Sequence, residues 1–135
     1  MIGTFTPEQV VRITAFIQGG YYLLTGIWAL VNITTFQMVT GPKTDLWLVR
    51  TVGVLVLVIG IVLGSAGVRR RFPLEVFLLA LGSCLGLAAI DIVYTLSGTI
   101  SPIYMLDALA ELALAASWTI FWRKLPREHS AAPTH

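Results

Sequence analysis

Charged side chains are scarce in this sequence of 135 residues. Asp, Glu, Lys and Arg make up 12% of the chain, against 56% hydrophobic residues, whereas an average soluble domain is about 25% charged. So few charges cannot cover the surface of a small soluble domain, and intrinsic disorder requires the opposite balance. The composition therefore predicts an integral membrane protein.

Cysteine and histidine are nearly absent as well. The single cysteine, Cys84, excludes a disulfide framework and a Cys-x-x-Cys redox pair. Both histidines, His129 and His135, lie at the C-terminal end, so we expect no histidine-based metal site or catalytic triad in the apolar part of the chain. The sequence also has no glycine-rich phosphate-binding loop. We therefore expect no catalytic residues, metal or cofactor, and the pattern favours a protein that is not an enzyme without deciding the question.

Four long apolar runs occupy most of the sequence. They cover about residues 8–31, 46–68, 74–96 and 103–122. A run of about 20–24 residues is long enough, as a helix, to cross a hydrocarbon core of ~30 Å. The sequence predicts an all-α fold, a polytopic four-transmembrane-helix bundle that forms one domain over residues 1–124. A flexible cytoplasmic tail is expected over residues 125–135.

Lysine and arginine are unevenly distributed between the two ends of the predicted helices. With four spans, the N-terminus, the second connection and the C-terminus share one side. The basic residues on that side are Arg12, Arg69, Arg70, Arg71, Arg123, Lys124 and Arg127. The opposite side has Lys43 and Arg50. Because basic residues concentrate on the cytoplasmic side, both termini are expected to face the cytoplasm, in a bacterial inner membrane, with contacts to the lipid bilayer and none to nucleic acid.

Small residues recur at helical spacing. The second predicted span has Gly53, Gly60, Gly64 and Gly67, and the third has Gly82 and Gly86. Lipid provides no hydrophobic force between helices, so close packing at small residues must hold such a bundle together. We expect these glycines to pack within the bundle. The alternative is that Gly60-x-x-x-Gly64 or Gly82-x-x-x-Gly86 faces outward and joins copies, or joins the chain to a larger membrane complex.

Four ionisable residues lie inside the predicted spans: Arg50, Asp91, Asp107 and Glu111. The helix rise places them roughly 6–12 Å from the outer ends of their spans, so three helices carry charge at one level. A charge that faces lipid costs about 2.5–3.5 kcal/mol near the bilayer centre. All four side chains are therefore expected to point into the bundle, Arg50 because it shares the glycine face of its helix with Gly53.

The spacing of these residues predicts a pocket. Asp107 and Glu111 are four residues apart and share a helix face with Tyr104, while Asp91 shares a face with Tyr94. The first span adds Gln18, Tyr21, Tyr22 and Thr25 at mid-depth. The predicted ligand-binding residues are Arg50, Asp91, Tyr94, Tyr104, Asp107 and Glu111, with Lys43 at the mouth.

Three functions fit this acidic pocket open to the outer side. The first is binding or handling of a small cationic or lipid-like ligand, with the tyrosines supplying hydroxyls or a cation–π face. The second is a non-catalytic accessory subunit or homo-oligomer, joined through one of the glycine pairs. In a purely structural role, the buried charges would instead hold the helices together by a bridge from Arg50 to Asp91 or Asp107. The third is a proton-coupled small-molecule transporter with Glu111 as the titrating group.

A family resemblance rests on Val11-Arg12, Gly19-Gly20 and Gly26 in the first span. With the four-span layout and length of the chain, these resemble the small DoxX-like superfamily of bacterial membrane proteins. Residues 39–49 also resemble a segment of other bacterial four-span proteins. The acids of the later spans are similar to those of the related EXPERA domains, which include sterol isomerase and the sigma-2 receptor. The resemblance implies that acids such as Asp91, Asp107 and Glu111 contact a cationic or sterol-like ligand. It carries no isomerase-like proton transfer, because no histidine lies within the spans.

Overall fold

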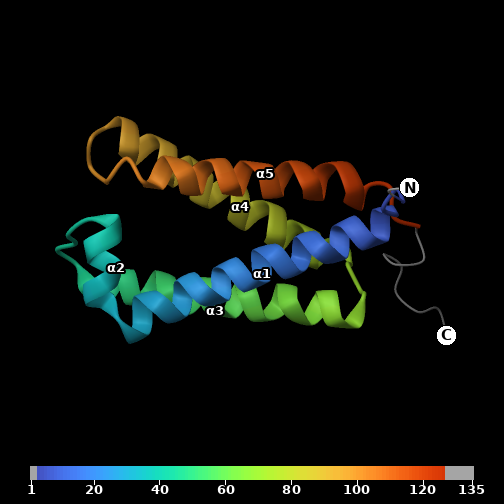
Figure 1. The fold of residues 1–135 in the computed structure, drawn as a ribbon, viewed down its shortest axis with the longest axis horizontal. Coiled ribbons are helices and arrows are strands. Elements are labelled where there is room, and N and C mark those ends of the chain that lie inside the picture. The colour runs from blue at the N-terminus through green and yellow to red at the C-terminus, as the bar shows by residue number, and fades with distance from the viewer. Residues whose placement is uncertain (1–2, 127–135) are drawn as a thin grey trace.

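Five helices make up residues 3–126, the part of the chain that the computed structural model describes (Figure 1). They are α1 (Pro7–Val31), α2 (Ile33–Thr40), α3 (Leu46–Arg69), α4 (Leu74–Leu96) and α5 (Tyr104–Trp122). All but α2 are long and apolar enough to cross a membrane. This confirms an all-helical integral membrane protein with four spans, each within one residue of its predicted bounds at either end. The predicted tail lies outside the described residues from residue 127 onward.

The first helix begins at a capping box. Thr6 Oγ1 accepts a hydrogen bond from the Gln9 backbone N–H at 3.2 Å, and Gln9 Oε1 accepts one from the Thr6 N–H at 3.0 Å. Pro7 occupies the first turn, where its missing N–H leaves no bond unmade. At the far end, Asn32 ends α1 and caps α2, and its side chain accepts a hydrogen bond from the Thr35 N–H at 3.1 Å.

Helix α2 was not expected from the sequence, which predicted only a connection between the first two spans. Its eight residues are too few to cross a membrane, and the β-branched residues of Ile33-Thr34-Thr35 weaken any helix signal. Packing against α1 stabilises this helix, which the intrinsic helix propensity of its residues does not favour. Phe36 of α2 lies edge-on against Trp28 of α1, with the ring centroids 5.2 Å apart. The short helix therefore folds back beside the end of α1.

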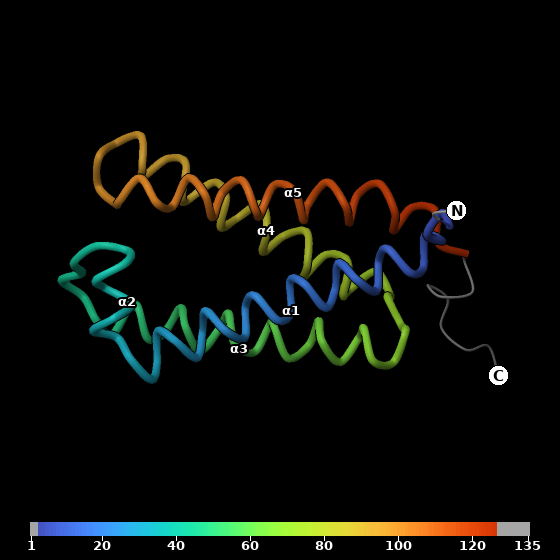
Figure 2. Tube along the Cα trace, viewed as in Figure 1, coloured from blue at the N-terminus to red at the C-terminus, as the bar shows by residue number. Residues whose placement is uncertain are grey.

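Helices α1 and α3 run antiparallel and form the most closely packed pair (Figures 1 and 2). A Cβ atom at Gly26 would lie 2.6 Å from the Gly53 carbonyl oxygen, and one at Gly60 would lie 2.8 Å from the Gly19 carbonyl oxygen. The two backbones therefore touch at glycine. This confirms that Gly53 and Gly60 pack within the bundle.

The expectation of intramolecular packing is wrong for the glycines of α4. A Cβ atom at Gly82 or Gly86 would meet nothing within 4 Å, and both residues are exposed. The physical reason is that α4 packs mainly against α5 and has little contact with α3. The glycine face of α4 is therefore left open.

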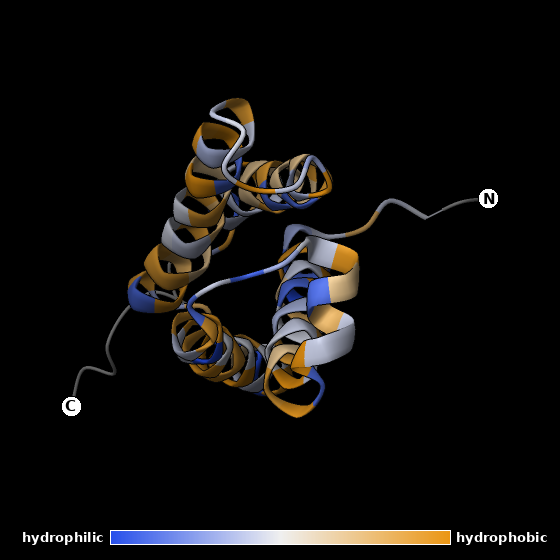
Figure 3. Ribbon diagram, turned by 90° about the vertical axis from the view of Figure 1, so that its left-hand side faces the viewer, coloured by the Kyte–Doolittle hydropathy of each residue, from blue (hydrophilic) through white to orange (hydrophobic). Residues whose placement is uncertain are grey.

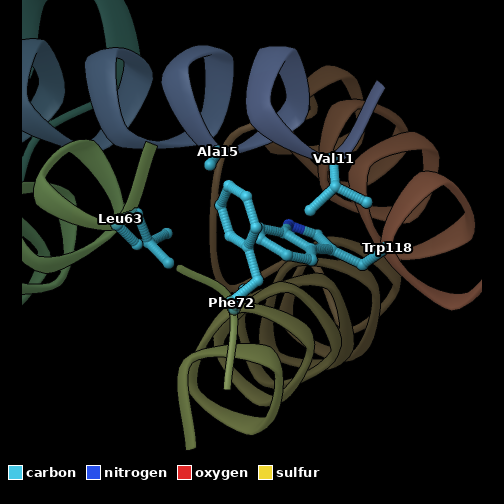
Figure 4. Packing of buried hydrophobic residues seen from close by; sticks show 7 residues of the cluster. Val11, Ala15, Leu63, Phe72 and Trp118 are labelled. Atoms are coloured by element: carbon cyan, nitrogen blue, oxygen red, sulfur yellow. The ribbon is translucent and has the colours of Figure 1, made fainter. Parts of the chain in front are cut away.

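A hydrophobic cluster closes one end of the bundle (Figure 4). Val11, Ala15, Leu63, Phe72 and Trp118 are all at most 1% exposed. The rings of Phe72 and Trp118 meet edge to face, with centroids 6.1 Å apart. The start of α1 and the end of α5 lie at this same end of the bundle (Figure 1). The cluster brings together side chains from α1, α3, α4, α5 and the α3–α4 connection, so it ties both helix pairs together there.

The α1–α3 contact predicts opposite effects for two glycines of the same helix. Gly60→Ala should destabilise the protein by about 1–3 kcal/mol, because the new methyl group would lie against the α1 backbone, which cannot move unless the helices separate. Gly64→Ala adds a methyl group that meets nothing within 4 Å, so stability should stay equal or rise. Melting temperatures of the two purified variants in one detergent test this. Equal effects of the two substitutions would contradict it.

Candidate functional site

A cavity of about 460 Å³ lies at the end of the bundle opposite the hydrophobic cluster. All five helices contribute to its wall, and Figure 3, viewed from this end, shows them arranged around the centre of the bundle. Its volume falls in the range of about 300–1,000 Å³ that is typical of small-molecule sites.

The two sides of the cavity differ in chemistry. Helix α3 contributes the apolar side chains Leu48, Val49, Val52 and Val56. Helices α1, α4 and α5 contribute most of the polar ones, which are Tyr21, Tyr22, Thr25, Asp91, Tyr104, Asp107 and Glu111. A molecule in this cavity would therefore have an apolar surface on one side and carboxyl and hydroxyl groups on the other.

Four of the six predicted site residues line this cavity: Asp91, Tyr104, Asp107 and Glu111. Of the residues that the first predicted span was expected to add, Tyr21, Tyr22 and Thr25 also line it, whereas Gln18 does not. Lys43 lines it as well, with its Nζ 4.9 Å from the centroid of the Tyr104 ring. Whether these residues bind a ligand remains a prediction, but the structure brings them together.

The predicted inward position of Arg50 is wrong. Arg50 is exposed and does not line the cavity. Residues three apart are separated by about 60° around a helix axis, so Gly53 can face α1 while Arg50 stays outside the interface. Arg50 also lies one turn from the start of α3, where a long side chain can extend toward the membrane surface.

The predicted position of Tyr94 in the pocket is also wrong. It lies three residues after Asp91, is 43% exposed and does not line the cavity. The same offset around the helix separates the two side chains, so only Asp91 is buried.

Glu111 is the most deeply buried acid of the site, with 1% of its surface exposed. Its Oε2 accepts a hydrogen bond from the Tyr22 hydroxyl at 2.8 Å, and that hydroxyl also lies 3.9 Å from Cys84 Sγ. Its Oε1 is buried without a hydrogen-bond partner. The sequence placed Tyr22 near the pocket but gave no signal that it, rather than Arg50, contacts an acid.

Asp91 and Asp107 complete the acidic group. Asp91 is 5% exposed, lies close to Asp107 and Glu111, and has its Oδ2 buried without a partner. Asp107 accepts a hydrogen bond from the Tyr21 hydroxyl. Within residues 3–126, no Lys or Arg forms an ion pair with any of these carboxyl groups. The bridge that a purely structural role required is therefore not formed.

The layer of the bundle below the cavity is different, because its polar groups are paired. Gln18 is fully buried; its Nε2 donates to the Ala80 carbonyl oxygen at 3.1 Å, and its Oε1 accepts from Trp118 Nε1 at 2.7 Å. One turn further, Thr14 Oγ1 and Ser117 Oγ lie 2.6 Å apart. Among the described residues, the buried side-chain oxygens without partners belong to Asp91, Glu111 and Thr95, all at the cavity end of α4 or on α5.

Comparisons with known proteins add no assignment: no family model matches the chain, and no similar protein was found among curated proteins or solved structures. The DoxX-like and EXPERA-like resemblance therefore stays a prediction. The described residues also include no group of three or more His, Cys, Asp and Glu side chains arranged to hold a metal ion.

The pairing of Tyr22 with Glu111 predicts unequal effects for two tyrosines. Tyr22→Phe removes the hydroxyl that donates to Glu111, and should lower the free energy of unfolding by about 1–3 kcal/mol. Tyr94→Phe is the matched control, because that side chain is exposed and outside the cavity. Denaturation in detergent micelles measures both variants. A Tyr22→Phe protein as stable as the Tyr94→Phe protein would argue against the buried hydrogen bond.

Proposed function

We propose that this membrane protein binds a small cationic, amphipathic molecule in the acidic cavity. The observation that carries the proposal is that Glu111 and Asp91 both line a cavity of ligand size, and that each carboxyl group has one buried oxygen without a hydrogen-bond partner. Leaving a buried polar group unsatisfied costs about 1–3 kcal/mol. A bound cation would place a positive charge beside both carboxyl groups, which the exposed Arg50 does not.

The apolar wall supports an amphipathic ligand rather than a small hydrophilic cation. Val49, Val52 and Val56 of α3 offer no hydrogen-bonding side chains, so a molecule in contact with them gains by burying apolar surface. The rings of Tyr21 and Tyr104 on the opposite side can face a cationic group. An organic cation also suits the donor set better than a metal ion, given the arrangement of the acids.

The closed end of the bundle favours binding over passage through the membrane. Below the cavity, the side chains of Gln18 and Trp118 are hydrogen-bonded to each other. The hydrophobic cluster around Phe72 and Leu63 fills the space beyond them. Proton-coupled transport stays a prediction, and it would require this cluster to open.

The distribution of charge supports the proposed orientation. Arg12, Arg123, Lys124 and the run 69–71 lie near the closed end of the bundle, whereas Lys43 and Arg50 lie at the cavity end. By the positive-inside rule the closed end would face the cytoplasm of a bacterial inner membrane. Both termini would then be cytoplasmic, and the cavity would open toward the outer side.

Binding of a matched pair of probes tests the proposal. Phenylbutylamine should raise the melting temperature of the purified protein, and phenylbutanol, of similar shape but uncharged, should not. Glu111→Gln should weaken amine binding by about 10- to 100-fold, because a hydrogen bond to a charged group contributes about 1.5–3 kcal/mol. Glu75→Gln is the control, since Glu75 is an exposed acid outside the cavity. Equal binding of amine and alcohol, or an equal loss in both variants, would count against the proposal.

The open glycine face of α4 favours a second candidate function, a homo-oligomer or accessory subunit. Gly82 and Gly86 are exposed, and their missing side chains would let another helix approach closely. If this face joins copies, the protein mass in detergent should be that of a dimer or larger assembly. Gly86→Leu should then return it to a monomer, whereas Gly20→Leu, in equally open space on α1, should not. A monomeric unmodified protein that co-purifies with no partner would eliminate this role.

A further inference from the structure

A second cavity, of about 430 Å³, lies on the outside of the α1–α3 pair and shares no lining residue with the acidic cavity. Phe16 and Leu23 of α1 form one side of it, and Gly60, Gly64, Val68 and Arg69 of α3 contribute to the other. We call this cavity the α1–α3 trough. Val68 is 69% exposed, so the trough opens to the surroundings of the bundle.

The trough is hollow above Gly64, although the α1–α3 contact does not require a glycine at that position. Gly60, one turn earlier, is buried, and a Cβ there would lie 2.9 Å from the Leu23 backbone nitrogen. A Cβ at Gly64 would meet nothing within 4 Å. The hollow over Gly64 is therefore space that a side chain could fill without disturbing the α1–α3 contact.

One end of the trough is charged. Arg69 is the last residue of α3. It lies nine positions after Gly60, a rise of about 13 Å along the helix. Arg69 is exposed, and no described residue forms a hydrogen bond or ion pair with its side chain. The neighbouring Arg12 is already engaged, because its Nε donates to the Gly67 carbonyl oxygen at 2.9 Å. The trough is thus an apolar channel on the membrane-facing surface that ends at an unpaired guanidinium near the end of the span.

We propose that the α1–α3 trough binds one anionic phospholipid, with an acyl chain over Gly64 and the phosphate at Arg69. A guanidinium matches a phosphate in charge and geometry, because its N–H groups can donate two parallel hydrogen bonds to phosphate oxygens. The helix end places that group at headgroup level while the apolar part of the trough lies within the span. A transmembrane helix of another copy fits less well, because α1 already covers Gly60, the other half of the glycine pair.

Native mass spectrometry of the purified chain in detergent, with phosphatidylglycerol or phosphatidylcholine added, tests this site. The unmodified protein should retain one phosphatidylglycerol more tightly than phosphatidylcholine. Arg69→Gln should weaken phosphatidylglycerol binding about fivefold, because a basic residue at the membrane surface contributes about 1 kcal/mol toward an anionic lipid. Gly64→Leu should weaken binding of both lipids by filling the trough. Arg69→Lys should restore part of the preference for the anionic lipid.

Two control variants separate the trough from general effects. Gly20→Leu adds the same side chain in open space on α1, and Arg71→Gln removes a nearby exposed arginine that does not line the trough. Both should bind phosphatidylglycerol as the unmodified protein does. Equal retention of the two lipids by the unmodified protein, or no effect of Gly64→Leu, would overturn the proposal. A dimer that Gly64→Leu converts to a monomer would overturn it in favour of a second copy of the chain.

Discussion

The contact between the backbones of α1 and α3 is the constraint on which the other helices depend. Gly19 and Gly26 of α1 meet Gly60 and Gly53 of α3 so closely that a Cβ atom at Gly19, Gly26 or Gly60 would lie within 2.6–3.0 Å of a backbone oxygen of the other helix. Because lipid provides no hydrophobic force between helices, this close approach supplies dispersion contacts that hold the pair together. It also sets the rotation of α1 about its axis, and therefore which of its side chains face α4 and α5.

The polar face of α1 follows from that rotation. Thr14, Gln18 and Tyr22 are spaced four residues apart, so they lie in one row along the helix. Each meets a partner on α5: Thr14 meets Ser117, Gln18 meets Trp118, and Tyr22 meets Glu111. All three side chains of the row are hydrogen-bonded, whereas at the cavity end the carboxyl groups of Glu111 on α5 and Asp91 on α4 each retain an oxygen without a partner. A ligand in the cavity would supply a partner for these carboxyl groups and so extend the hydrogen-bonded network between the helices.

Much of the fold and part of the site could be predicted from local rules. Helix bounds follow from the apolar runs and from caps such as Thr6 and Pro73, and the common depth of Asp91, Asp107 and Glu111 follows from the fixed rise of a helix. The three acids accordingly lie together in one cavity. The direction in which a side chain faces was less predictable: Arg50 was expected beside them and is exposed, since its helix is turned by its contact with α1.

The sequence by itself determined the class of protein, its four spans and the level at which the acids lie, because hydrophobicity and helix rise are local properties of the chain. Tertiary structure alone decided which glycines pack and which stay open, that α2 folds back beside α1, and that Tyr22 rather than Arg50 contacts Glu111. Those outcomes depend on the rotation of each helix about its axis. That rotation is set by contacts between residues far apart in the sequence, such as Gly26 with Gly53, and Gln18 with Trp118.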